Sequence, residues 1–253
     1  MDRIRIDLSQ YRNAVFLTGA GISVASGIRP YRGPDGLWND AALVRLSDGD
    51  YFRKEPLEVW RFWSETRRIA AAASPNAAHL ALARLEAEAR AAGRGFTLVT
   101  QNIDGLHARA GSRNVVEYHG SVARTRCTNP RCGREPWADA SLYTESVPTC
   151  PACGAILRPD IVLFHEMIPQ ANAEAAMEAL GRCDLFVAIG TSGTVYPAND
   201  FVRWAGRAGA RTVYMNLEAL DDCEGLFGEQ YLGRAEEIVP PIFGEGLLVS
   251  PNA

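Results

Sequence analysis

Residues 14–38, AVFLTGAGISVASGIRPYRGPDGLW, contain the pattern on which the fold prediction rests. Residues 14–17 are a short apolar run, and Thr18, Gly19, Ala20 and Gly21 follow it at once. This order is typical of a buried parallel strand that runs into a glycine turn. Glycines in the turn let the backbone approach a ligand closely. The helix expected next would direct its N-terminal N–H groups at a phosphate.

The glycine spacing alone does not settle whether a ligand binds here. The pattern is Gly-x-Gly-x-x-Val rather than the full dinucleotide fingerprint, so a plain strand-to-helix turn without a ligand is the alternative. The residues that follow, from Ser23 to Gly36, form a long polar loop that carries Arg32. A loop this rich in polar groups exceeds what a connector needs, which favours a binding site.

Length and composition exclude several classes of protein. A chain of 253 residues with 47% hydrophobic and 22% charged residues suits one large soluble domain, or one domain with an insert. A net charge of -4 and a pI near 5.7 argue against direct nucleic-acid binding. No window is apolar enough to span a membrane, and the first ten residues are too charged for a signal peptide. We therefore expect a cytoplasmic protein.

The order of elements predicts an α/β fold with a doubly wound parallel sheet. Apolar strands are expected at 14–17, 96–99, 115–118, 161–164, 185–189 and 212–217, and they alternate with helices. One of these helices would begin with Ser74 as its N-cap, and a last strand-turn-helix piece is expected at 238–248. We assign residues 1–40, 74–120 and 158–253 to a Rossmann-like domain, 41–73 to a helical insert and 121–157 to a zinc-binding module.

Polar groups follow five of the predicted strands. They are Gly19–Ser23, Gln101–Asp104, His119, Gly190–Ser192, and Asn216 with Glu218. In a doubly wound sheet the carboxyl ends of the strands meet at one crevice, so these groups are expected to converge. Glu218 follows the strand after Gly190, where an acidic group reaches an adenosine ribose hydroxyl in dinucleotide folds. Each loop taken singly could also be a plain turn.

Four cysteines form two pairs with the spacing of a zinc site. Cys127 and Cys132 are separated by four residues, and Cys150 and Cys153 by two. Four thiolates in two such pairs suit a tetrahedral zinc ion. Because four sulfurs leave no open position, we interpret the zinc as structural. A zinc-ribbon module that binds nucleic acid is the alternative, and the negative net charge speaks against it.

His119 is the candidate general base. A histidine at a strand end is more often structural, but the neighbouring strands here end in Gln101, Asn102 and Gly190, so His119 is expected to face the crevice. An imidazole with a pKa near 6.5 suits this work. His79 lies inside an alanine-rich helix and is expected to be structural, while His107 could have either role.

These residues together resemble the sirtuins, NAD-dependent protein lysine deacylases, over nearly the whole chain. The resemblance is closest to the bacterial branch that includes demalonylases and desuccinylases. It rests on GAGISVASGI (19–28), YRGPDGLW (31–38), TQNIDGLH (100–107), YHG (118–120), the two cysteine pairs, LRPDIVLF (157–164), GTS (190–192) and NLE (216–218).

The resemblance implies an NAD site with distinct regions. Ala20, Ser23 and Arg32 would contact the pyrophosphate, Asp104 would hold the nicotinamide carboxamide, and Tyr31 would cap the nicotinamide pocket. The full set of implied NAD contacts is Gly19, Ala20, Gly21, Ser23, Tyr31, Arg32, Trp38, Gln101, Asn102, Ile103, Asp104, Gly190, Thr191, Ser192, Asn216, Leu217, Glu218 and Ala235.

The implied reaction has His119 and Asn102 as its catalytic residues. The carbonyl oxygen of an acyl-lysine attacks C1′ of the nicotinamide ribose and expels nicotinamide. His119 then takes a proton from the ribose diol, and water finally releases lysine and 2′-O-acyl-ADP-ribose. Zinc held by the four cysteines would be structural. Mono-ADP-ribosyl transfer or NAD hydrolysis at the same site is the alternative, and a hydride-transferring dehydrogenase is disfavoured because no second acid–base pair is evident.

The resemblance also places the acyl-lysine peptide, as an extra strand near Val162 and Phe164. In the desuccinylase branch a Tyr and an Arg three residues later bind the acyl carboxylate, and this chain has Trp63 and Thr66 there. Arg67 would lie on the same helix face as Trp63. We expect a preference for neutral acyl groups and weak desuccinylation. His165 stands where the family usually has glycine, so it would touch the peptide.

Overall fold

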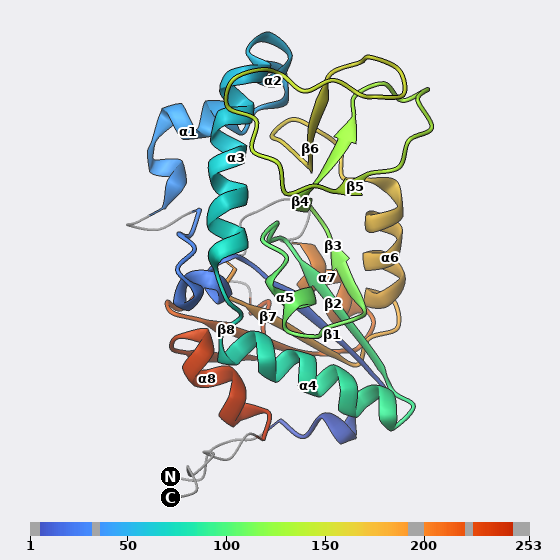
Figure 1. Ribbon diagram of the computed structural model, residues 1–253. Helices are drawn as coiled ribbons and strands as arrows, with labels where there is room; N and C mark the ends of the chain where they lie inside the picture. Colours follow the sequence, from blue (N-terminus) through green and yellow to red (C-terminus); the bar gives the residue numbers. More distant parts are fainter. Residues whose placement is uncertain (1–5, 32–35, 192–199, 221–224, 245–253) are drawn as a thin grey trace, which may run out of the picture.

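A computed structural model describes residues 6–31, 36–191, 200–220 and 225–244 of the protein, which form a large and a small part (Figure 1). The large part contains a six-stranded sheet in the order β3-β2-β1-β7-β8-β9, and every neighbouring pair is parallel. The predicted doubly wound α/β fold is confirmed. The strands are β1 (Asn13–Thr18), β2 (Gly95–Thr100), β3 (Val115–Glu117), β7 (Leu185–Ile189), β8 (Arg211–Asn216) and β9 (Glu229–Leu232).

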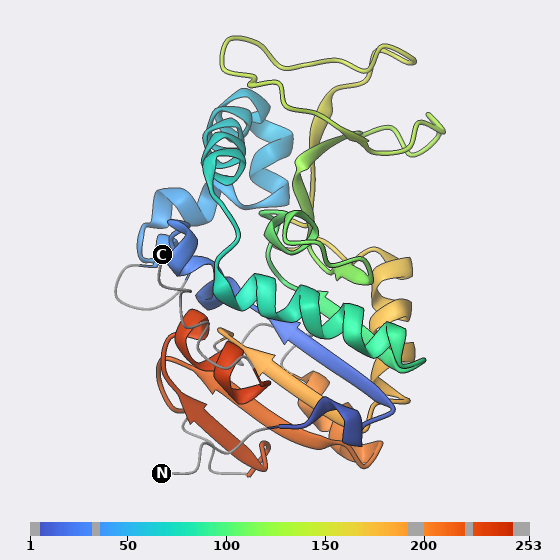
Figure 2. The same ribbon diagram turned by 60° about the horizontal axis from the view of Figure 1, so that its bottom comes forward.

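Helices cover both faces of this sheet because its central strands are apolar on both sides. In β1, Ala14 and Phe16 belong to one apolar cluster, and Val15 and Leu17 belong to another. This follows from the two-residue repeat of a strand. The first cluster packs against α4 (Ala77–Ala91) and α8 (Ala235–Ile242), and the second against α6 (Gln170–Leu180) and α7 (Phe201–Arg207). Figure 2 shows α4 and α8 on the same side of the sheet.

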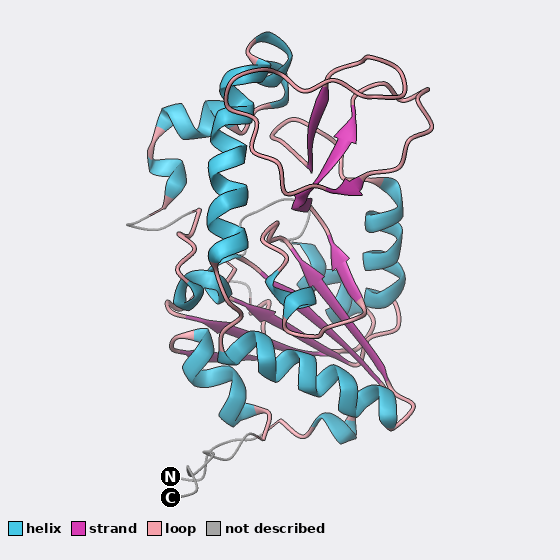
Figure 3. Ribbon diagram, viewed as in Figure 1, coloured by secondary structure: helices cyan, strands magenta, loops and turns pink. Residues whose placement is uncertain are grey.

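The small part combines three helices with a second sheet (Figure 3). The helices are α1 (Ala41–Leu46), α2 (Gly49–Lys54) and α3 (Pro56–Ala72). The sheet has the order β5-β4-β6 and contains β4 (Gly120–Cys127), β5 (Trp137–Ala138) and β6 (Leu157–Ile161). A third apolar cluster, which includes Trp60 and Trp63 of α3, joins the helices to this sheet. The small sheet extends beyond the 121–157 segment at both ends.

The N-terminus of α4 differs from the prediction. The N-cap is Asn76, whose side chain accepts from the Ala78 N–H at 3.0 Å, and not Ser74. His79 completes a capping box, since its Nδ1 is 3.4 Å from the Asn76 N–H. The His79 ring is fully buried and lies 4.8 Å from that of His107, measured between centroids. Burial lowers the pKa of His79 to about 4 and also lowers that of His107 well below its usual value.

Other segments depart from the prediction at their boundaries. The helix expected after the glycine turn is a 3-10 helix over Ala20–Ser26. The predicted strand at 161–164 is wrong, because β6 ends at Ile161 and Phe164 makes one isolated bridge. Among the described residues, the last strand and helix are β9 and α8, which begin before the segment predicted at 238–248, and residues 245–248 of that prediction lie outside the described part. Three further short elements lie in the described part of the chain, at Leu8–Gln10, Leu37–Asn39 and α5 (Leu106–Arg109). Among the described residues, no helix is long and apolar enough to cross a membrane.

Candidate active site

A cavity of about 890 Å³ lies at the carboxyl ends of β1, β2, β3, β7 and β8, with the small part as its other wall. The sequence predicted that the polar groups following these five strands converge, and the structure brings them together. The predicted site residues that line the cavity are Gly19, Ala20, Gly21, Tyr31, Trp63, Gln101, Asn102, Ile103, His119, Val162, Phe164, His165, Gly190, Thr191, Asn216, Leu217, Glu218 and Ala235.

The glycine turn after β1 packs directly on the turn after β7. The Gly21 N–H donates to the Gly190 carbonyl oxygen at 2.8 Å. A Cβ atom on Gly19 would lie 2.7 Å from that oxygen, and a Cβ atom on Gly21 would lie 2.7 Å from Gly190 Cα. Gly190 itself has a φ of +60°, which favours glycine. These glycines are therefore required for contact between the two turns, in addition to any approach to a ligand.

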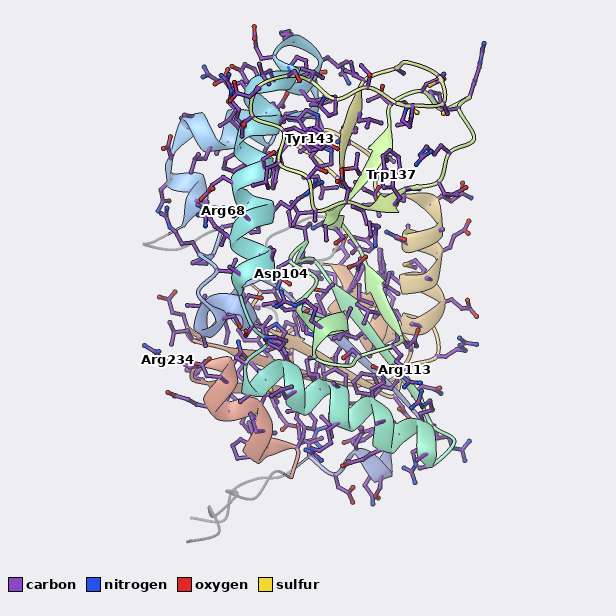
Figure 4. The ribbon with its side chains drawn as sticks, viewed as in Figure 1. Arg68, Asp104, Arg113, Trp137, Tyr143 and Arg234 are labelled. Carbon is purple, nitrogen blue, oxygen red and sulfur yellow. The ribbon has the colours of Figure 1, made fainter. Side chains whose placement is uncertain are left out.

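Asn102 is held by a polar network beneath the β1 turn. Its Nδ2 donates to the Gly19 carbonyl oxygen at 3.0 Å and to Ser23 Oγ at 3.2 Å. Both amide hydrogens are thus used, so Oδ1 is the atom of this side chain that a ligand can use. Ser23 in turn donates to Asp104 at 2.8 Å, and neither residue lines the cavity. Burial raises the pKa of Asp104. Figure 4 shows Asp104 between the large sheet and α3.

The same network reaches the buried histidine His107. His107 Nε2 lies 2.9 Å from Thr18 Oγ1, and the Thr18 hydroxyl donates to Thr100 Oγ1 at 2.9 Å. Thr100 Oγ1 also accepts from the Asn102 N–H at 3.1 Å. Since the Thr18 proton is used, His107 Nε2 must donate. Because burial lowers the pKa of His107 well below its usual value, the ring is neutral and supports Asn102 through Thr18 and Thr100. The open prediction for His107 is therefore answered as structural.

His119 has the geometry of a base. It directly follows Tyr118 at the end of β3 and is half-buried at the cavity wall. Its Nδ1 lies 2.9 Å from the Gln101 carbonyl oxygen. A carbonyl oxygen only accepts, so Nδ1 carries the proton and Nε2 keeps its lone pair. Burial lowers the pKa of His119, and the hydrogen bond to Gln101 opposes part of this effect. The ring is therefore neutral at pH 7.

A second network ties the loops at the β7 and β8 ends together. Thr191 Oγ1 donates to Gln101 Oε1 at 3.0 Å, which links the β7 loop to the β2 loop. The Thr191 carbonyl oxygen accepts from the Tyr214 hydroxyl at 2.9 Å, and Asn216 Nδ2 donates to that hydroxyl at 2.8 Å. Leu217 and Glu218 are exposed at the cavity rim next to Asn216.

Helix α3 brings Trp63 to the cavity but not Thr66 or Arg67, one turn further along the helix. Trp63 lines the cavity and donates from Nε1 to the Leu46 carbonyl oxygen at 3.1 Å. Thr66 is absent from the lining and donates to the Phe62 carbonyl oxygen at 3.1 Å. The expected place of Arg67 beside the acyl group is not supported either, because its side chain is 3% exposed and points to the small sheet.

The Arg67 guanidinium is fully occupied by that sheet and the loop after it. It makes hydrogen bonds of 2.7–3.2 Å and one ion pair of 3.4 Å. Its partners are the carbonyl oxygens of Val122, Ser141 and Arg124, Oγ1 of Thr125 and Oδ2 of Asp139. This arginine therefore joins α3 to the small sheet.

The segment that follows β6, where the sequence resemblance predicts the substrate peptide, forms one wall of the cavity, which we call the peptide-side wall. The Val162 N–H donates to the His119 carbonyl oxygen at 3.0 Å, and the Phe164 N–H to that of Ser47 at 2.8 Å. Glu166 accepts from Arg158 at 2.5 and 2.8 Å and from the Leu163 N–H at 2.9 Å, which anchors the segment from below. His165 lines the cavity with a φ of +66°, which is unusual outside glycine.

The four predicted metal ligands form one cluster. The Sγ atoms of Cys127, Cys132, Cys150 and Cys153 all lie within 4.8 Å of one another. The closest pairs are 3.6 Å for Cys127–Cys153 and 3.7 Å for Cys132–Cys150. A tetrahedron with metal–sulfur bonds of about 2.3 Å has sulfur–sulfur edges of about 3.8 Å, so the cluster fits zinc. It lies in the small part, outside the cavity lining.

Some predicted contacts lie elsewhere and some cavity residues escaped prediction. Arg32, Ser192 and the side chain of Trp38 lie outside the described residues. Residues that line the cavity without having been predicted include Val24, Ser47, Tyr118, Met167, Ile168 and Arg234. Ser47, Met167, Ile168 and Arg234 come from the ends of α1 and α8 and from the segment after β6, for which the sequence carried no motif, whereas Val24 and Tyr118 lie within recognised motifs but were not predicted as contacts.

The parallel sheet, its glycine turns and the cavity that contains His119 define a dinucleotide-binding protein of the Rossmann-like class. A family model described as the Sir2 family matches residues 19–197. The NAD-dependent protein deacylase 2 of Pyrobaculum aerophilum is 41% identical over 240 residues, covering 94% of this chain and 92% of the relative. The chain therefore belongs to the Sir2 family.

Solved structures agree with this assignment. A Sir2 homolog in complex with NAD is 34% identical, with a TM-score of 0.83, over 93% of this chain and 89% of its own. A structure titled as Sir2 with a p53 peptide and NAD+ is also 34% identical, with a TM-score of 0.79 over 93% of both chains.

Proposed function

We propose that this protein removes acyl groups from lysine side chains of proteins, with NAD as the second substrate and nicotinamide, 2′-O-acyl-ADP-ribose and free lysine as products. The main support for this conclusion is the state and position of His119. Its imidazole is neutral, and its Nε2 lone pair is available in the cavity that the glycine turns and the peptide-side wall enclose. Membership of the Sir2 family, whose relatives include NAD-dependent protein deacylases, supports it.

The NAD site is assigned to the predicted residues at the strand ends. The β1 turn with Ala20 would face the pyrophosphate, and Asn216 and Glu218 would face the adenosine. The nicotinamide ribose would then lie against Gln101 and Asn102, beneath Tyr31. These groups line a single cavity, and the strand ends along it run from β3 through β1 to β8. This supports the order of nicotinamide ribose, pyrophosphate and adenosine along the sheet edge.

His119 would act on the ribose while Asn102 orients it. When bound, NAD supplies an electrophilic C1′, which the acyl oxygen attacks as nicotinamide leaves. His119 Nε2 then accepts a proton from a ribose hydroxyl, and the hydrogen bond from Nδ1 to Gln101 stabilises the resulting cation. Asn102 Oδ1 would accept a hydrogen bond from the bound ribose or from water. A general base of this kind contributes about 10²–10⁴-fold to the rate.

The acyl group would be neutral and would lie near Trp63. The peptide would follow Val162 and Phe164, and His165 would touch it. Among the described cavity residues the one arginine is Arg234, which lies 3.9 Å from Glu236 at the start of α8, on the proposed adenosine side. A succinyl carboxylate would therefore lack the charge-assisted hydrogen bond that is worth roughly 1.5–3 kcal/mol, or roughly 10- to 100-fold in specificity.

One assay tests both the reaction and the acyl preference. The protein is incubated with NAD and matched acetyl- and succinyl-lysine peptides, and nicotinamide, free peptide and acyl-ADP-ribose are followed by mass spectrometry. We expect higher kcat/KM for acetyl-lysine and a His119→Ala variant at least 100-fold slower. Equal or better succinyl turnover contradicts the acyl preference. Nicotinamide release without free peptide indicates mono-ADP-ribosyl transfer or NAD hydrolysis.

Three further expectations stay predictions. For the three-part division of the chain, the apolar clusters support the separation of the Rossmann-like domain from the rest, while one cluster is shared by the helical insert and the zinc-binding module. A cytoplasmic location is supported by the four cysteines that are placed to bind a metal ion rather than to form disulfides, as is typical of a reducing compartment. The absence of direct nucleic-acid binding is supported by the net charge of -4.

A further inference from the structure

A second hollow, which we call the side groove, opens next to the peptide-side wall of the cavity. It has a volume of about 420 Å³ and shares two of its residues, Phe164 and His165, with the cavity. A peptide that follows Val162 and Phe164 would therefore have a side chain near the acyl-lysine within reach of it. The groove is lined by Val44, Arg45, Asp48, Asp50, Tyr51, Lys54, Phe164 and His165.

The wall between the two hollows is fixed to the turn before α2. The Gly49 N–H donates to the Phe164 carbonyl oxygen at 3.2 Å, next to the isolated bridge between Asp48 and Phe164. His165 Nδ1 lies 2.8 Å from Asp48 Oδ2, which holds the ring at its left-handed backbone position. The groove therefore has a defined place relative to the cavity.

Both carboxylates of the groove are already committed to partners. Asp48 accepts from the Tyr51 N–H at 2.8 Å through Oδ1, and Oδ2 contacts the His165 ring. Asp50 forms an ion pair with Arg53. Neither carboxylate is therefore available to bind a cationic side chain without breaking a contact that the fold already makes.

The cations of the groove are held less firmly. Arg45 lies over the Tyr51 ring, 4.8 Å from its centroid, and is 3.7 Å from the nearer carboxylate oxygen of Glu58. Lys54, the one lysine of the sequence, is exposed, and its ammonium has no hydrogen bond or ion pair among the described residues. The available charge of the groove is thus positive. The neighbouring Glu55 is exposed but does not line it.

We propose that the side groove binds an acidic side chain of the substrate protein, close in sequence to the acylated lysine, through Lys54 and Arg45. An aspartate or glutamate would place its methylene groups against Val44 and Phe164 and its carboxylate toward the two cations. This inference rests on the proposed deacylase function and adds a preference for sequence around the lysine.

The test uses acetyl-lysine peptides that differ only by Glu or Gln, with the change scanned over the positions on both sides of the lysine. At one position we expect kcat/KM for Glu to exceed that for Gln by about two- to five-fold, through KM, as for an exposed ion pair. Added salt is expected to reduce this ratio, because exposed charges are screened.

Variants of the lysine make the test specific. Lys54→Met is expected to bring the Glu/Gln ratio close to one, Lys54→Arg to keep it, and the remote exposed control Arg68→Met to leave it as in the parent. The Lys54 side chain is exposed, and thermal unfolding checks that each variant is folded. A ratio of one at every position, or a ratio that survives Lys54→Met, overturns the proposal. Failure to deacetylate any peptide instead overturns the proposed function.

Discussion

Replacing Arg67 by alanine tests whether this buried arginine stabilises the fold or binds the acyl group of the substrate. The change would remove the Arg67 hydrogen bonds to three carbonyl oxygens and to Thr125, together with the ion pair to the 7% exposed Asp139 side chain. Asp139 would keep its hydrogen bonds from Thr125, Ser141 and Tyr143 but would lose the positive charge that balances it. Removing one member of a buried ion pair costs about 3–5 kcal/mol. Each kcal/mol lowers Tm by about 2–4 °C in a chain of this size, so we expect Tm to fall by about 6–20 °C.

The matched control is the adjacent residue Arg68, which lies on the side of α3 away from the small sheet (Figure 4). Its side chain is 58% exposed and pairs with Glu65 on the same helix. An exposed pair of this kind contributes about 0.3–0.5 kcal/mol, so Arg68→Ala is expected to lower Tm by about 2 °C at most. Thermal unfolding is followed by circular dichroism at pH 7.

The acyl preference of the variants is then measured at a temperature where they remain folded. The ratio of succinyl to acetyl kcat/KM is expected to stay within about two-fold of the parent for Arg67→Ala. If this variant is too unstable to purify, Asp139→Asn weakens the same pair from the other side while keeping its shape. An Arg67→Ala protein with unchanged Tm and a tenfold selective loss of desuccinylation would refute our account of this residue.

The remaining predictions concern the metal and acid stability. We expect one zinc ion per chain by mass spectrometry. A chelator is expected to abolish peptide turnover and to expose residues 127–153 to protease, because that segment depends on the metal for its fold. A metal-free protein with full turnover contradicts this. Acid is expected to weaken the fold through His79, whose pKa is about 4 when folded and about 6.5 when unfolded. Below pH 6.5 the unfolded chain takes up the proton first, so stability is present above pH 6.5 and falls by up to about 3 kcal/mol on the way to pH 4. Urea unfolding of the parent and of His79→Gln at pH 7 and pH 4.5 measures this, and an equal loss in both proteins contradicts the assignment.

The parallel sheet and its site could be predicted because local patterns determine them. A strand buried on both faces is apolar throughout, as in 185–189, and a glycine turn marks its carboxyl end. The five strand ends then converge for topological reasons alone. The zinc cluster could also be predicted, because the spacing of the cysteines is itself the signal.

What the sequence did not determine depends on contacts between distant segments. Helical periodicity correctly placed Arg67 on the same face of α3 as Trp63. That face, however, meets the cavity at one end and the small sheet at the other, so neighbouring positions have different roles. Ser74 and Asn76 are both good N-cap residues, and the capping box with His79 decided between them.

The position of His119, the proposed general base, links the large and the small part of the fold. His119 joins β3 of the large sheet to β4 of the small sheet, and the next residue, Gly120, has a φ of +81° and no room for a Cβ atom. Arg124 spans the same junction, with ion pairs to Glu117 at 2.5 Å and to Asp160 at 2.8 Å. The Val162 N–H also donates to the His119 carbonyl oxygen, so the peptide-side wall is attached to the base itself. In the proposed arrangement, the angle between the two sheets would therefore set the distance from His119 Nε2 to a ribose held by the large sheet and to a peptide held by the small part. On this proposal, any change that rotates the small part would act on both substrates at once.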